Sequence, residues 1–135
     1  MAQIVLTDVT VSINSVDLAS RATSVVINYE KEATEVTAFG DASRKFVAGL
    51  NNISVDVELN QDFAASNVEA TVFPLVGTTT TVIFKPTSAA VSSTNPSYTV
   101  TGAYLASHTP INGAVGELGT TSLTFEGGTL AKATS

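Results

Sequence analysis

The chain has 135 residues, of which 44% are hydrophobic and only 13% are charged, and this length predicts a single domain spanning 1–135. The net charge of −6, from 12 acidic and 6 basic residues, argues against tight binding to a nucleic-acid backbone, which needs Lys and Arg. The lack of Cys excludes disulfides, thiolate catalysis and Cys-based zinc sites, and the scarcity of charge indicates large surfaces buried against other copies.

The N-terminal half predicts β-strands, because polar and apolar residues alternate along it. The clearest run is 52–59, Asn-Ile-Ser-Val-Asp-Val-Glu-Leu, and similar runs occupy 8–13 and 22–30. Asn14 and Ser15 predict a tight turn into a further short strand. The chain does not open with a basic stretch and an apolar core, so we predict no signal peptide. No apolar stretch approaches the roughly 20 residues of a membrane helix.

The segment 31–50 interrupts this alternation and predicts a long projecting loop. It contains two glycines, and three of the six basic residues of the chain lie in it. Aromatic and Arg side chains are enriched at protein interfaces, and here they stand next to charges of both signs. We therefore predict that the loop forms contacts between subunits. The interface candidates are Phe39, Asp41, Arg44, Lys45 and Phe46.

One helix is predicted within 61–76, most clearly over 66–76. Ser66 and Glu69 have the spacing of a capping box, in which each side chain accepts a hydrogen bond from a free backbone N–H of the first turn. The apolar residues Val68, Val72 and Leu75 then share one face, so the helix is expected to lie against a sheet.

The C-terminal half again predicts strands, at 80–85, 98–108 and 120–126. The glycine-rich segment 110–119 predicts a connection between the last two of these strands. The residues after 127–128, a Gly-Gly pair, are expected to be frayed.

Few residues offer chemistry. His108 is the single histidine, and a solvent-exposed position at the end of a strand is favoured over a catalytic role. Asp56 and Glu58 point to the same side of one strand, which could hold a cation or form an acid pair, but a solvated acidic face explains them better. No residues of this chain combine the base, nucleophile and orienting group of an enzyme, so we predict no catalysis and no cofactor.

Two further motifs have weak functional meaning. The glycines of 113–119 resemble a phosphate-binding loop but lack the Gly-Lys-Ser/Thr ending, so a turn between strands is preferred. The triplet Asn52-Ile53-Ser54 matches a glycosylation acceptor, which carries little weight without a secretory signal.

The order of these elements resembles the major tail tube protein of long-tailed bacteriophages. The resemblance rests on four stretches whose order and spacing match: 37–50, 59–63, 68–77 and 115–125. It implies a β-sandwich or partial barrel with one short helix on its flank. It also implies that six copies form a ring and that stacked rings form a hollow tube.

By the same resemblance, the lumen conducts the genome without sequence-specific binding, and the 31–50 loop contacts a neighbouring ring or subunit. An acidic, hydroxyl-rich lumen offers phosphate no adhesive partner, and Asp8, Asp56 and Glu58 are the lumen-facing candidates. The implied partners are other copies, the tape measure, the tail terminator and the tail tip. The implied location is the virion tail, after synthesis in the host bacterial cytoplasm.

Two other functions fit a β-module of this size. A capsid decoration protein would form trimers or monomers on a lattice instead of stacked hexamers. A ligand-binding β-sandwich would be expected to expose Trp or clustered Tyr, but the chain has no Trp and its three Tyr are scattered.

Overall fold

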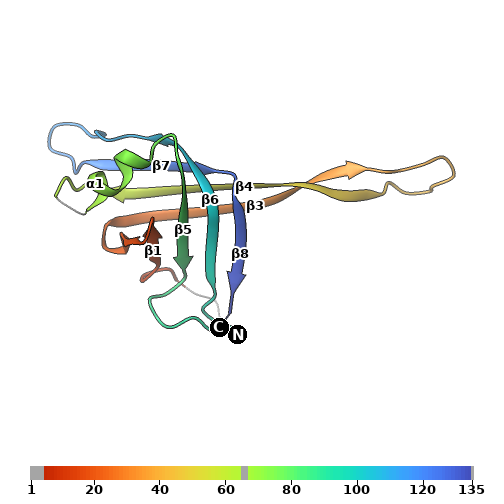
Figure 1. The fold of residues 1–135 in the computed structure, drawn as a ribbon, viewed down its shortest axis with the longest axis horizontal. Coiled ribbons are helices and arrows are strands. Elements are labelled where there is room, and N and C mark those ends of the chain that lie inside the picture. The colour runs from red at the N-terminus through yellow and green to blue at the C-terminus, as the bar shows by residue number, and fades with distance from the viewer. Residues whose placement is uncertain (1–4, 65–66, 135) are drawn as a thin grey trace.

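The computed structural model describes residues 5–64 and 67–134, and these residues are folded mainly as β-strands (Figure 1). The strands form one antiparallel sheet in the order β2-β1-β5-β6-β7-β4-β3, and β8 pairs with β6 outside this path. The predicted mainly β fold with a single short α-helix is confirmed. The elements are β1 (Thr10–Ile13), β2 (Val16–Asp17), η1 (Ala19–Arg21), β3 (Ala22–Glu35), β4 (Phe46–Asn60), α1 (Val68–Val72), η2 (Phe73–Leu75), β5 (Thr79–Lys85), β6 (Ser97–His108), β7 (Thr120–Glu126) and β8 (Thr129–Ala133).

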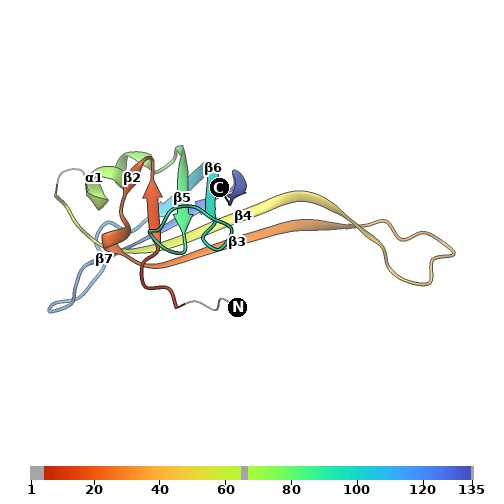
Figure 2. The same ribbon diagram turned by 90° about the horizontal axis from the view of Figure 1, so that it is seen from below.

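The sheet folds over itself into two layers. β5, β6 and β8 run across the direction of β3, β4 and β7, and the two groups lie at different heights when the molecule is turned (Figures 1 and 2). β6 belongs to both layers, because its first half pairs with β8 and its second half with β7. The result is an open partial barrel, with β3 and β2 as the ends of the strand path.

The core fills the space between the two layers. The alternation of β4 places four apolar side chains inward, and β7, β5, β6 and α1 supply the facing ones. Burying a large apolar side chain contributes roughly 1.5–3 kcal/mol, so this cluster is the main source of stability. Its largest fully buried members include Ile13, Leu18, Ile53, Leu59, Leu105, Leu123 and Phe125.

The helix is shorter than the sequence predicts. α1 covers five residues, and the chain then tightens into the 3-10 turn η2, in which Pro74 occupies an early position. Proline lacks the N–H that would continue an α-helix. The predicted apolar face is present, with Val68 and Val72 buried and Leu75 packed against the core. Ser66 of the predicted capping box lies outside the described residues.

Two other segments differ from the prediction, and one turn agrees with it. Strand β3 continues to Glu35 and β4 begins at Phe46, so half of the predicted 31–50 loop is paired strand and the other half, 36–45, is the loop that joins the two strands. The residues after the Gly-Gly pair are not frayed, because 129–133 pair with β6 as β8. The predicted turn at Asn14 and Ser15 is present, with φ of 51° and 69°, as a tight hairpin turn requires.

Candidate functional site

The hairpin of residues 31–50, here called the arm, projects far beyond the two-layered body (Figure 1). Where it leaves the body, the register between β3 and β4 slips between Lys31 and Ala33, which gives β4 one extra residue. Such a bulge increases the local twist, and the two ribbons cross there in Figure 1. The arm buries none of its side chains, since every residue of 31–50 is exposed except the half-buried Asp41.

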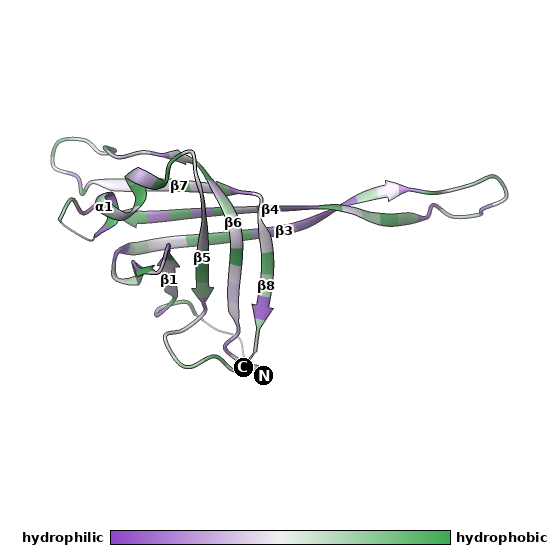
Figure 3. Cartoon of the chain, viewed as in Figure 1, coloured by the Kyte–Doolittle hydropathy of each residue, from purple (hydrophilic) through white to green (hydrophobic). Residues whose placement is uncertain are grey.

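Apolar side chains are concentrated on the arm although it has no core. Figure 3 shows a hydrophobic stretch of β4 outside the body. Leu50 is 78% exposed, and Phe39, at the end of the arm, is fully exposed. A group of large apolar side chains exposed to water marks a surface that a partner covers. The large apolar residues exposed on the arm are Val36, Phe39, Phe46, Val47 and Leu50.

The tip of the arm, residues 36–45, is held in shape by its own polar groups. The Asp41 carboxylate accepts a hydrogen bond from the Ala38 N–H at 2.8 Å and pairs with Lys45 Nζ at 3.0 Å. That N–H, together with the Lys45 ammonium, lowers the pKa of Asp41 below its usual 3.8. The Lys45 N–H in turn donates to Thr37 Oγ1 at 2.9 Å. Asp41 and Lys45, both predicted as interface residues, therefore make contacts within the tip.

The other three interface candidates point outward. Arg44 is 78% exposed at its side chain and lies 3.8 Å from Glu35, a distant pair that leaves its other guanidinium nitrogens available. Phe46, opposite Glu35 in the β3–β4 register, and Phe39 are both exposed. The structure thus brings all five candidates together on one projection and divides them into two that shape the tip and three that it presents.

A second surface is the outer face of β3, β4 and β7, here called the acidic face. Asp56 and Glu58 lie on it side by side, each in register with a hydroxyl residue of β7, namely Thr124 and Ser122. Glu126, which the sequence analysis missed, joins them one step farther along β7, opposite Ser54. Its position in the alternation of 120–126 could have placed it there. The paired positions of this face are Ser24, Val26, Asn28, Glu30, Asn52, Ser54, Asp56, Glu58, Asn60, Thr120, Ser122, Thr124 and Glu126, with no Lys or Arg among them.

Hydrogen bonds between strands hold this face in place. Thr124 Oγ1 donates to Asp56 Oδ1 at 3.2 Å, and Asn28 Nδ2 donates to Ser54 Oγ at 3.3 Å. These bonds link β7 to β4 and β4 to β3. The face therefore presents fixed carboxylates among hydroxyl and amide groups, an arrangement that repels phosphate.

Asp8, the third lumen candidate, lies apart from this face. It precedes β1, and its carboxylate accepts hydrogen bonds from the backbone N–H and the hydroxyl of Ser88. Asp56 and Glu58 are therefore brought together, while Asp8 belongs to a groove between β1, β3 and β5.

His108 is buried, which corrects the expectation that it is exposed at the end of a strand. Its side chain is only 2% exposed, with Nε2 at 2.9 Å from Glu69 Oε1 and Nδ1 at 2.9 Å from Thr121 Oγ1. Gln61 Nε2 also donates to Glu69 Oε1, at 3.2 Å. The reason for the burial is the irregular register of β6 and β7 between Leu105 and Ser107, which turns His108 inward opposite Leu123.

Glu69, His108 and Thr121 have the residue types of a catalytic triad, but they stabilise the fold. Thr121, in the nucleophile's place, is fully buried, and none of the residues lining either of the two main hollows belongs to the His108–Thr121 pair. A nucleophile needs access to a substrate carbon. The cluster instead joins α1 to β6 and β7 through buried, satisfied hydrogen bonds.

Other kinds of site find little support in the described part of the chain. Across 5–64 and 67–134, no group of three or more His, Asp or Glu side chains is placed to hold a metal ion. No helix among these residues is long and apolar enough to cross a membrane.

Comparisons with known proteins give matches of structure alone. No family model and no curated protein matches the sequence. A chain of the PVC sheath/tube terminator, from an extracellular contractile injection system in its extended state, is 12% identical with a TM-score of 0.75, covering 98% of this chain and 97% of that one. A chain of the virion of a native gene transfer agent is 11% identical with a TM-score of 0.73, covering 93% and 95%. A chain of the anti-feeding prophage tube-terminating cap is 11% identical with a TM-score of 0.71, covering 100% and 95%.

The tail tube resemblance is confirmed at the level of the fold. The matched chains come from injection systems and a gene transfer agent, so the fold does not single out the long-tailed phages. These chains are parts of virion and injection assemblies, and that this chain is not an enzyme stays a prediction.

Proposed function

We propose that this protein is a structural subunit of a phage-like tail tube, in which rings of six copies stack into a hollow conduit for the genome. The observation that carries the proposal is the acidic face, which lies on the same sheet as the exposed arm and next to a free strand edge. Each of these three features is a liability for a monomer and useful in a tube.

Ring closure is supported by the strand edges. Among the described residues, β3 pairs only with β4, so the other side of this 14-residue strand leaves a row of backbone N–H and C=O groups unpaired. Within the part of the chain that the structure describes, β8 pairs only with β6, so the side of β8 that faces away from β6 is a second free edge of the subunit. Free edges readily pair with strands of other copies. Two different edges on one subunit favour head-to-tail contacts, which close into a ring when the rotation allows it.

The channel wall in this proposal is the acidic face. Asp56, Glu58 and Glu126 would place a ring of negative charge around the passing DNA, with hydroxyl groups between the carboxylates. DNA binds proteins mainly through Lys and Arg at its phosphates, and this face has none at its paired positions. Asp8, which lies in the groove, is left out of the proposed wall.

The arm supplies the contact between rings, and other tail components supply the ends. Its exposed apolar residues would be covered by a subunit of the adjacent ring. We propose the tape measure, the tail terminator and the tail tip as further partners. The virion tail is the proposed location, after synthesis in the host bacterial cytoplasm.

Electron microscopy of the purified, concentrated protein in negative stain tests the proposal. Hollow tubes or six-fold rings are expected, because free edges and the arm both favour growth. Three-fold particles would instead indicate a capsid decoration protein. Persistent monomers that bind members of a glycan array would indicate a ligand-binding β-sandwich.

A charge reversal tests the channel wall. Changing Asp56 and Glu58 to Lys removes two negative charges and adds two positive ones per subunit, and both positions are exposed, so the fold should be kept. Assembled variant tubes should bind short duplex DNA with an affinity that falls steeply with salt, whereas wild-type tubes should not bind it. The matched control changes Ala114, Val115 and Glu117 to Lys, which gives the same change in net charge at exposed positions of the 109–119 connection, outside the acidic face. Equal DNA binding by both variants would contradict the assignment of the wall.

A further inference from the structure

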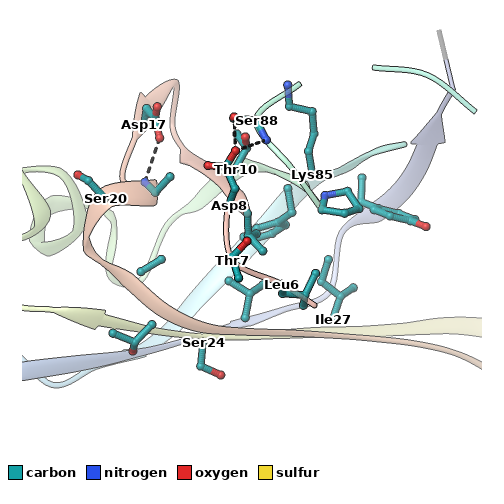
Figure 4. Close-up of a pocket in the computed structure, with 18 residues that line it drawn as sticks. Leu6, Thr7, Asp8, Thr10, Asp17, Ser20, Ser24, Ile27, Lys85 and Ser88 are labelled. Carbon is teal, nitrogen blue, oxygen red and sulfur yellow. Dashed lines mark hydrogen bonds between the residues drawn. The ribbon is translucent and has the colours of Figure 1, made fainter. Parts of the chain in front are cut away.

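A groove of about 700 Å³ opens between the segment that leads into β1, the start of β3 and the end of β5 (Figure 4). It exists because the sheet is open between its β2–β1 end and its β3 end. Its volume is in the range of sites that enclose a ligand or several side chains. The apolar part of its lining is formed by Leu6, Val25, Ile27, Phe84, Pro86 and Tyr98.

The groove is also weakly acidic. The carboxylates of Asp8 and Asp17 line it against one cation, Lys85. Asp8 is fixed by Ser88, and Asp17 Oδ1 accepts the Ala19 N–H at 2.9 Å, so both carboxylates are held at the groove in defined positions. Lys85 Nζ donates to the Ala89 carbonyl at 3.0 Å, which draws its charge toward the 86–96 loop.

The tip of the arm has the opposite character. Its only charged residues are Arg44 and Lys45 against Asp41, in a chain that is acidic overall. Lys45 and Asp41 neutralise each other at 3.0 Å, whereas Arg44 is paired only distantly with Glu35 of β3, at 3.8 Å, so Arg44 is the cation that the tip exposes. Phe39 belongs to the same tip and is fully exposed. The tip is therefore a preformed knob that presents an aromatic ring and a guanidinium, and aromatic and Arg side chains are enriched at protein interfaces.

A copy cannot fill its own groove. The arm tip lies at one end of the molecule, and β1 and the start of β3 lie toward the other, in both views (Figures 1 and 2). An arm tip that occupies the groove must therefore belong to another copy. A second copy is the partner that offers both an apolar ring and a cation in a fixed shape.

We propose that the groove of one copy receives the arm tip of a second copy, with Phe39 against the apolar lining and Arg44 beside Asp8 and Asp17. This inference rests on the proposed function, because it names the seat of the arm in the adjacent ring. The knob and the groove are different surfaces of the same chain, so the contact is heterologous and can repeat without end along one direction. It would give the stack of rings a polarity.

The absence of Cys makes a crosslinking test direct. One single-cysteine variant carries Ala38→Cys at the tip, which keeps the ring of Phe39, and its mate carries Leu6→Cys or Thr23→Cys, one on each wall of the groove. All three positions are exposed, so the variants should fold. Mixed and assembled under mild oxidation, each pair should give a crosslinked dimer. The control mate, Ala114→Cys, is exposed in the 109–119 connection away from the groove and should give none.

The outcomes separate this inference from the proposed function. Tubes whose Ala38→Cys subunits crosslink to Ala114→Cys, or to no groove position, would contradict docking of the arm tip in the groove without contradicting the tube. A wild-type protein that stays monomeric at every concentration would overturn the proposed function and this inference with it.

A truncation series measures the strength of the contact. Phe39→Ala should raise the concentration needed for half-assembly about thirtyfold, the effect of losing a typical hot spot. Phe63→Ala removes another exposed ring, outside the arm and the groove, and it should leave assembly unchanged. Equal effects of the two changes, with circular dichroism unchanged in both, would count against the proposed docking.

Discussion

The body and the arm are made from the same two strands but are stabilised in opposite ways. In the body, β4 buries every second side chain between two layers, whereas beyond residue 52 toward the tip it buries none. Both parts keep the ladder between β3 and β4. Backbone pairing therefore shapes both regions, whereas apolar burial stabilises only the body. The arm lacks that burial as an isolated chain, and we infer that assembly supplies it.

The largest expected difference between the two regions is the effect of removing an aromatic ring. Phe125 is 1% exposed at the centre of the core, so Phe125→Ala should lower the free energy of unfolding by about 3–5 kcal/mol. Phe46→Ala, in the arm, should change it by less than about 0.5 kcal/mol. Chemical denaturation followed by circular dichroism measures both. Similar losses for the two variants would mean that the arm also contributes to the stability of the monomer.

A smaller effect is expected from the buried hydrogen-bond cluster. His108→Ala removes the partner of Glu69 and Thr121 and leaves the fully buried Thr121 hydroxyl unsatisfied. The free energy of unfolding should fall by about 2 kcal/mol, which is more than for a substitution at an exposed position. Asn112→Ala, which loses one exposed hydrogen bond to Thr120, is the control. If both variants unfold at the same denaturant concentration as the wild type, the cluster does not stabilise the body.

Removing the arm should have almost no effect on the body. Replacing residues 32–50 with Asn-Gly connects Lys31 to Asn51, its partner in the register, through a two-residue hairpin turn. The variant should unfold at the same denaturant concentration as the wild type, because no core residue is lost. It should not stack into tubes when concentrated, so light scattering should detect nothing larger than a single ring. A collapsed β-signal in circular dichroism would show that the arm is needed for folding and not only for assembly.

The last expected difference between the regions is in how Tm depends on pH. The Ala64 N–H and the Arg21 guanidinium, at 2.8 Å, hold the pKa of Asp62 below 3.8. A lowered folded-state pKa stabilises the protein above 3.8, and this contribution is lost as the pH falls through the folded value. Asp62→Asn should therefore lower Tm at neutral pH, and the difference from the wild type should disappear in acid. Asp41→Asn removes a carboxylate whose pKa is also lowered, but its contacts lie within the exposed tip, so it should lower Tm at neutral pH less than Asp62→Asn does. A Tm difference for Asp62→Asn that persists in acid would contradict this account.

The sequence predicted the body well because burial leaves a period-two pattern. The alternation of 52–59 and of 120–126 gave the strands, their inward faces and the shared side of Asp56 and Glu58. The arm was predicted as a loop, because a hairpin without a buried face has no such alternation. Its role as a single projection bearing Phe39 and Arg44 could still be inferred from composition.

The errors in the C-terminal half have one cause, which is irregular pairing. The slip between Leu105 and Ser107 reverses the alternation of β6, so the position of His108 in the sequence pattern does not indicate that it is buried. Thr121 did carry a signal, because it occupies an inward position in the alternation with Leu123 and Phe125. A polar residue there predicts a buried partner. The pairing of β8 depends on the far half of β6, a contact that no local pattern reports.

The continuity of β3 and β4 from the arm into the body has a mechanical consequence. A pull on the tip acts along both strands at once, so in the body it is resisted by the pairing of β4 with β7, whose hydrogen bonds lie side by side across the load. The hydrogen bonds of the body must then break together in shear, and not one after another as in peeling. A chain of subunits joined through such arms would resist stretching with the strength of whole ladders, while the exposed hairpins between bodies would let it bend.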